Sequence, residues 1–81
     1  THQEDISLYP TVLHPLQMIH IRTLSHTRIE LYDIMGEQLL QTYCEGDEIQ
    51  LQAPANSGIY IVKILYLDDS NKALTRKIMI E

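Results

Sequence analysis

The stretch SGIYIVKI, residues 57–64, constrains the fold more than any other part of the chain. A serine-glycine turn signal runs directly into an apolar segment, in which Tyr60, Val62 and Ile64 fall on one face of an extended strand. The opposite face is also largely apolar, with Lys63 as its polar member. Such a segment indicates a central strand of a sheet, with Tyr60 buried and its hydroxyl reaching the edge of the core.

The same two-residue period recurs along the chain, while no window of a dozen residues keeps the apolar spacing of an amphipathic helix. Short strands separated by turn signals are typical of a β-sandwich or β-barrel. We therefore predict an all-β fold with seven strands, at residues 6–9, 16–21, 28–34, 38–44, 48–52, 59–67 and 73–80.

Turn residues stand between these predicted strands. In YDIMGE, Asp33 suits the first position of a type I turn, where its carboxylate accepts a backbone N–H, and Gly36 suits the left-handed fourth position. Gly46 separates the next two strands, residues 53–58 make a longer connection, and residues 67–72 close the last hairpin.

Size and composition exclude several classes of protein. A chain of 81 residues makes one small domain, which buries only about 60% of its unfolded surface and leaves little room for a deep cleft. The net charge is −5, and basic residues gather only at Lys72, Arg76 and Lys77, so we expect no nucleic-acid partner. No apolar stretch approaches the roughly 20 residues of a membrane span, and Cys44 is a single cysteine, so it has no partner for an internal disulfide.

Two groups of residues resemble metal ligands without matching a known pattern. His14, His20 and His26 are spaced by six residues, which fits no local ligand motif. Asp68 and Asp69 lie in a polar turn that lacks the twelve-residue pattern and closing glutamate of a calcium loop. We expect surface histidines and a plain hairpin turn, with no metal and no cofactor.

The chain offers no evident catalytic group. Cys44 with a histidine, or Ser25 with His26, would need the fold to bring nucleophile and base together. Paired carboxylates such as Glu45 and Asp47 flank turns, where charge serves solubility. We therefore expect no catalytic residues and no enzyme activity.

The tyrosines leave one alternative function open. Tyr32, Tyr43, Tyr60 and Tyr66 would form a platform for sugar rings if they shared a surface. In a chain without Phe or Trp, however, tyrosines are needed to fill the core and its rim. An accessory module of a secreted enzyme, binding carbohydrate or protein, is the alternative.

Four pieces of the sequence share their order and spacing with one family. They are SLYP at residues 7–10, IELYDIMGEQLL at residues 29–40, SGIYIVKI at residues 57–64 and TRKIMIE at residues 75–81. Together they resemble the C-terminal sorting domain of the bacterial type IX secretion system, as found in Bacteroidetes. The resemblance covers residues 6–81, which leaves the polar residues 1–5 as a linker to an upstream cargo.

The resemblance implies a seven-stranded immunoglobulin-like β-sandwich that has no activity of its own. It implies a sorting signal, which directs a covalently attached cargo from the periplasm through an outer-membrane translocon to the cell surface or the medium. In this family a sortase-like cysteine peptidase commonly removes the domain and joins the cargo to an anionic lipopolysaccharide. The cleaved bond would then lie in residues 1–5 or upstream of them, in flexible polar chain.

The resemblance also implies roles for particular residues. Gly36 matches the hairpin glycine of the family, Gly58 and Tyr60 match its glycine-x-tyrosine signature, and Lys77 begins its closing strand. We expect that last strand to be displayed to a partner, by docking or by strand addition. The predicted recognition positions are Gly58, Tyr60, Val62, Lys63, Lys77, Ile78 and Ile80, and the predicted structural turn is Asp33 with Gly36.

Overall fold

Short strands make up most of the part of the chain that the structure describes. The structure is a computed structural model, which describes residues 6–23, 26–67 and 72–81. These residues form no helix, and the all-β prediction is confirmed. The strands are β1 (Ser7–Tyr9), β2 (Val12–Leu13), β3 (Met18–Arg22), β4 (Thr27–Asp33), β5 (Gln38–Cys44), β6 (Glu48–Gln52), β7 (Gly58–Tyr66) and β8 (Ala73–Ile80).

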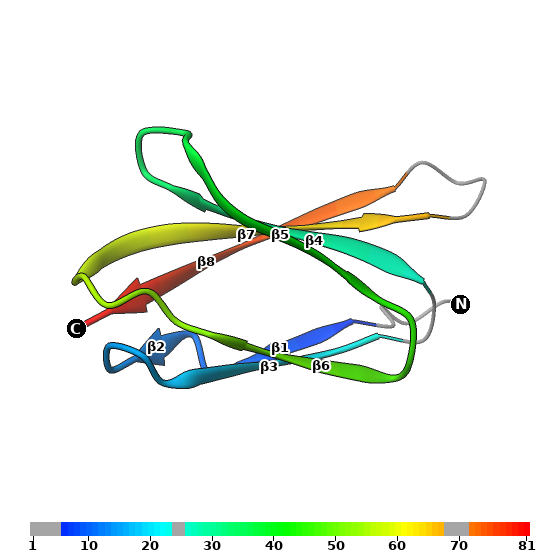
Figure 1. Cartoon of the computed structure of the whole chain (residues 1–81), viewed down its shortest axis with the longest axis horizontal. Helices are drawn as coiled ribbons and strands as arrows, with labels where there is room; N and C mark the ends of the chain where they lie inside the picture. The colour runs from blue at the N-terminus through cyan, green and yellow to red at the C-terminus, as the bar shows by residue number, and fades with distance from the viewer. Residues whose placement is uncertain (1–5, 24–25, 68–71) are drawn as a thin grey trace.

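The strands form two sheets packed as a sandwich (Figure 1). One sheet has the order β1-β3-β6 and the other the order β2-β8-β7-β4-β5. All neighbours are antiparallel except β2 and β8, which are parallel. The chain changes sheets between β1 and β2, next to the cis peptide bond between Tyr9 and Pro10. The arrangement is consistent with the predicted immunoglobulin-like sandwich.

The predicted number of strands was one too low, because the sequence gives no sign of β2. This strand has two residues and lies between Pro10 and Pro15, which leaves too little length for an alternating pattern. Its place is set by β8, whose Met79 N–H donates to the Thr11 carbonyl at 2.8 Å. The N–H of Glu81 donates in the same way to the carbonyl of the second β2 residue, also at 2.8 Å.

The core lies between the two sheets and is almost wholly aliphatic. Tyr60 is the only aromatic residue among the buried residues that the structure describes. Removing such side chains from water stabilises the fold by about 1.5–3 kcal/mol each. The fully enclosed members are Leu13, Ile19, Ile21, Ile29, Val62, Ile64, Ile78 and Ile80.

Strand β7 occupies the position predicted from its sequence. It pairs with β4 on one edge and with β8 on the other over nearly its whole length. The start of β1 and the end of β8 lie toward opposite ends of the sandwich (Figure 1). The end of β8 lies beside the start of β7, because Gly58 pairs with Ile80.

Candidate recognition surface

The glycine-x-tyrosine segment anchors the entry into β7. Gly58 has φ +149°, a conformation that side chains disfavour, so a glycine here lets the loop turn into the strand. Two residues later Tyr60 is 8% exposed, and its hydroxyl donates to the Asn56 carbonyl at 2.8 Å. This is the geometry of the tyrosine corner of immunoglobulin-like sandwiches. The predicted burial of Tyr60, with its hydroxyl at the rim, is confirmed.

The seven predicted recognition residues do not share one surface. Val62, Ile78 and Ile80 point into the core and have 2% exposure or less. Lys63 and Lys77 alternate with these residues and point outward, Lys63 half-buried and Lys77 exposed. Only the two lysines are therefore placed to contact a partner through long side chains.

The outward face of the five-stranded sheet carries an apolar row at the end where β8 stops. Val12 of β2, Met79 of β8 and Ile59 of β7 stand next to one another in register. Val12 and Met79 are both exposed, and Ile59 is half-buried. Lys77 stands one position back along the same face, so a positive charge borders the apolar row.

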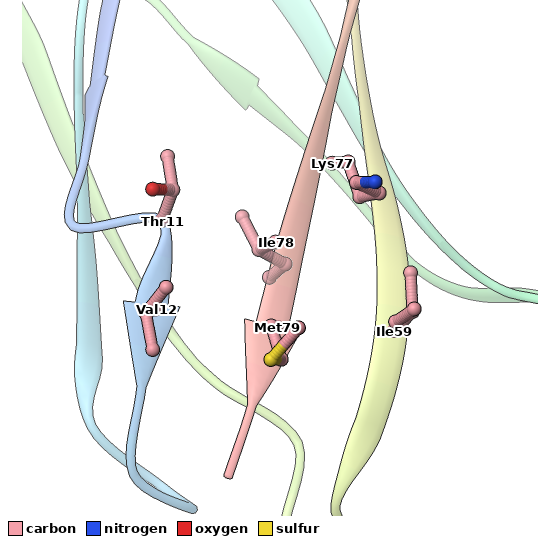
Figure 2. A pocket seen from close by; sticks show the side chains of 6 residues that line it. All are labelled: Thr11, Val12, Ile59, Lys77, Ile78 and Met79. Carbon is pink, nitrogen blue, oxygen red and sulfur yellow. The ribbon is translucent and has the colours of Figure 1, made fainter.

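A shallow hollow lies over this row, with a volume of about 140 Å³. Figure 2 shows the side chains that surround it, contributed by Thr11 and by strands β2, β7 and β8. Its lining is mainly hydrocarbon, with the Lys77 side chain as its charged member. The lining residues are Thr11, Val12, Ile59, Lys77, Ile78 and Met79.

A second feature of the outward face is a buried carboxylate, which the sequence analysis did not find. Glu30 of β4 is 4% exposed although it points away from the core. Its Oε2 forms an ion pair of 2.8 Å with Arg28 Nε, at an angle outside hydrogen-bond geometry. Its Oε1 accepts a 2.6 Å hydrogen bond from the Tyr32 hydroxyl, which also lies 3.1 Å from Gln38 Oε1.

This arrangement affects the ionisation of Tyr32. The hydrogen bond to Glu30 is the main cause that raises the pKa of Tyr32, and burial and the negative charge of Glu30 act in the same direction. The positive charge of Arg28 opposes them. The phenol therefore keeps its proton to higher pH than an ordinary tyrosine, and its contact with Gln38 ties β4 to β5 across the outer face.

The hairpin between β4 and β5 has a closely hydrogen-bonded turn. The Oδ1 of Asp33 accepts from the N–H groups of Met35 and Glu37, both at 2.9 Å. The Asp33 carbonyl accepts from the Gly36 N–H at 3.0 Å, and Gly36 has φ +89°. The turn exposes Ile34 by 71% and Met35 by 86%, so it presents two apolar side chains to solvent.

The remaining candidate groups are dispersed. His20 Nδ1 lies 3.4 Å from Glu48 Oε2 and its ring stacks on Tyr9 at 5.2 Å, whereas His14 and His26 are exposed. Residues 6–23, 26–67 and 72–81 contain no group of three or more side chains placed to hold a metal ion.

The other groups weighed from the sequence also lie apart. The buried Cys44 thiol lies 3.4 Å from the Gly46 carbonyl. Ser25 and the acidic turn with Asp68 and Asp69 lie outside the described residues.

The tyrosines divide between the two faces of the large sheet. Tyr60 lies in the core and Tyr66 packs against it. Tyr32 is held by Glu30, and Tyr43 is exposed on the outward face of β5. A platform that uses all four rings therefore does not form.

Comparison with protein families identifies the sandwich. The family model described as a secretion system C-terminal sorting domain matches residues 7–81. The chain belongs to this family. The resemblance found from the sequence is thereby confirmed over nearly the whole of the sorting domain. Within the residues that the structure describes, no helix is long and apolar enough to cross a membrane.

The sorting domain matches a short part of a much longer curated relative. An endo-acting ulvan lyase of Formosa agariphila is 22% identical over 79 residues. The match covers 95% of this chain and 15% of the relative. The sorting domain thus spans about 15% of the length of the relative that it matches.

Proposed function

We propose that this sorting domain is a non-catalytic secretion address, which directs an attached cargo protein across the outer membrane through the type IX secretion system. The observation that carries the proposal is the family match over residues 7–81. The relative supports it, because a sorting signal is expected to be a small part of the protein that it exports. The cargo passes through the periplasm and ends at the cell surface or outside the cell.

The predicted recognition residues divide into two roles in this proposal. Lys63 and Lys77 contact the translocon directly, since they are the outward members of the set. The remaining members act through the fold by holding β7 and β8 in place. These are Gly58, Tyr60, Val62, Ile78 and Ile80, and the Asp33–Gly36 turn does the same for β4 and β5.

Processing at the cell surface completes the proposal. A sortase-like cysteine peptidase cuts in residues 1–5 or upstream of them, and the cargo is joined to an anionic lipopolysaccharide. Mass spectrometry of the exported cargo tests this step. Cargo that still carries residues 6–81 would contradict it.

The export step is tested by fusing residues 1–81 to the C-terminus of a periplasm-directed fluorescent protein, in a bacterium that has the type IX system. We expect fluorescence at the surface or in the medium, on a protein shortened by about the mass of the sorting domain. A second fusion without residues 77–81 should remain in the periplasm. That deletion removes the core residues Ile78 and Ile80, so Lys77→Ala serves as the variant that leaves the core intact.

The accessory-module alternative predicts a different result for the same fusions. A carbohydrate- or protein-binding module would leave the parent fusion in the periplasm and would stay on the mature protein. Retention of a folded, uncut parent fusion would therefore overturn the sorting proposal.

A further inference from the structure

One edge of β8 is covered over only part of its length. The N–H groups of Met79 and Glu81 donate to carbonyls on the β2 side. Because N–H groups alternate between the two edges of a strand, Thr75 and Lys77 turn their N–H groups toward that same edge. Strand β2 pairs only with Met79 and Ile80, and in the described part of the chain no strand covers Ala73–Lys77 on this side.

The charge at this edge differs from the charge of the whole chain. The chain carries −5, yet no acidic residue lies between Asp69 and Glu81, and three of the six basic residues do. Lys77 is exposed, and no acidic side chain pairs with it among the described residues. The uncovered edge therefore combines the N–H groups of Thr75 and Lys77 with the positive charge of Lys77, while the Thr75 carbonyl accepts a hydrogen bond from Arg76 Nη1 at 3.0 Å.

The hollow over Val12 and Met79 begins where this uncovered edge ends. A side chain placed beside Lys77 on an added strand would lie on the outward face, next to this hollow. Its methylene groups would pack on Val12 and Met79, and a terminal carboxylate would reach the Lys77 ammonium group.

We propose that the β8 edge at Thr75–Lys77 accepts an extended, carboxylate-bearing segment of a partner protein as an added strand, placed end to end with β2. Strand addition supplies affinity through backbone hydrogen bonds and specificity through alternate side chains. Residues 12–13 already show that a strand binds along this edge. The inference rests on the proposed function, since the partner is then a component of the export apparatus.

The occupant is acidic rather than a second copy of this chain. Two β8 edges brought together would bury lysine and arginine side chains beside one another, and like charges at such distances repel. A carboxylate opposite Lys77 makes a charge-assisted hydrogen bond instead.

The first test changes the backbone donor at Thr75. Proline is tolerated on edge strands where the N–H faces outward, so Thr75→Pro removes this donor and keeps the pairing with β7. Thr75→Val keeps the N–H and is the matched control. In the fluorescent fusion we expect Thr75→Pro to lower export about tenfold and Thr75→Val to export like the parent. Cooperative thermal unfolding of the Thr75→Pro domain would show that it is folded. If the folded Thr75→Pro fusion and the Thr75→Val fusion were then exported equally, the inference would be overturned and the sorting function would stand.

The second test measures binding directly and does not depend on export. The 81-residue chain is mixed with a peptide of alternating glutamate and valine, and amide hydrogen exchange is followed by NMR. We expect exchange at Thr75 and Lys77 to slow about tenfold, with no such effect from the same peptide carrying lysine in place of glutamate. Lys77→Glu should abolish the protection and Lys77→Arg should keep it.

Two outcomes of the second test would overturn the inference. One is unchanged exchange at both amides with either peptide. The other is that the chain forms a dimer and that Thr75→Pro abolishes this dimer. The strand added to the β8 edge would then come from a second copy of the chain. If the parent fusion is not exported while the glutamate peptide protects both amides, the sorting function fails and the acidic-strand site stands.

Discussion

The inner and outer faces of β7 and β8 differ in composition although they alternate along the same strands. On the inner face Val62, Ile64 and Ile78 are wholly enclosed between the sheets. On the outer face Lys63 is half-buried and Lys77 is exposed. The same strands therefore hold the fold together with one set of residues and present a surface with the other.

This difference changes the interpretation of the residues that carry the family resemblance. Gly58 and Tyr60 belong to a corner that fixes how the chain enters β7, and Ile78 and Ile80 fill the core. A variant at any of these positions alters the whole domain. A variant at Lys77 alters the surface alone, so the two faces can be separated by experiment.

The largest expected effect comes from the inner face. Ile78→Ala removes a fully enclosed side chain, which should lower the free energy of unfolding by about 2–5 kcal/mol. Lys77→Ala, one residue earlier, should change it by less than about 0.5 kcal/mol. Chemical denaturation of both variants measures this difference. Comparable losses from the two variants would mean that the faces do not divide as described.

The sequence predicted the alternation well, because a period of two is a local property. The segments at residues 38–44, 48–52 and 73–80 match β5, β6 and β8 at both ends. The direction in which a face points is not local. The pattern placed Ile78 and Ile80 on one face, but pairing of β8 with β7 and packing against the second sheet decide that this face is the core.

The entry into β7 sets which face each residue takes, so Gly58 should show the next largest effect. Gly58→Ala forces a side chain into a sparsely populated conformation, at a cost of about 1–3 kcal/mol. The added carbon itself would have room, since its nearest neighbour is Tyr60 Cε1 at 3.8 Å. Gly46→Ala is the control, because nothing lies within 4 Å of the added carbon and no positive φ is required there. Equal melting temperatures for the two variants would contradict the conformational role of Gly58.

The tyrosine corner should have a smaller effect, confined to one hydrogen bond. Tyr60→Phe leaves the Asn56 carbonyl without its partner and should destabilise the domain by about 1 kcal/mol. Tyr43→Phe, at an exposed ring on the outer face, is the matched control and should change stability little. Thermal unfolding of both proteins tests the prediction, which fails if Tyr60→Phe unfolds at the temperature of the parent.

The outer face contains the feature that the sequence could not reveal. In RIELYD, Glu30 stands at an outward position, where a charged residue is normally exposed. Its burial comes from Arg28 and Tyr32 on the same strand together with neighbours in β5 and β7, where Gln41 and Lys63 occupy the paired positions. The spacing of two puts Arg28, Glu30 and Tyr32 on one face of β4, but Gln41 and Lys63 become neighbours of Glu30 only after the sheet has formed, so the sequence does not show that Glu30 is buried.

The smallest expected effect lies in the ionisation of this cluster. Because Glu30 raises the pKa of Tyr32, the folded domain keeps the phenol proton to higher pH than the unfolded chain does, whose tyrosines titrate near 10. The stabilisation is therefore fully present below about pH 10 and is lost as the pH rises through the folded pKa of Tyr32. Glu30→Gln removes the negative charge and should move the pKa of Tyr32 back toward its ordinary value, whereas Glu48→Gln in the other sheet should not. NMR titration of the Tyr32 ring signals measures both. An unchanged Tyr32 titration in Glu30→Gln would mean that burial alone raises the pKa of Tyr32. The carboxylate of Glu30 would then have no influence on the ionisation of the Tyr32 phenol.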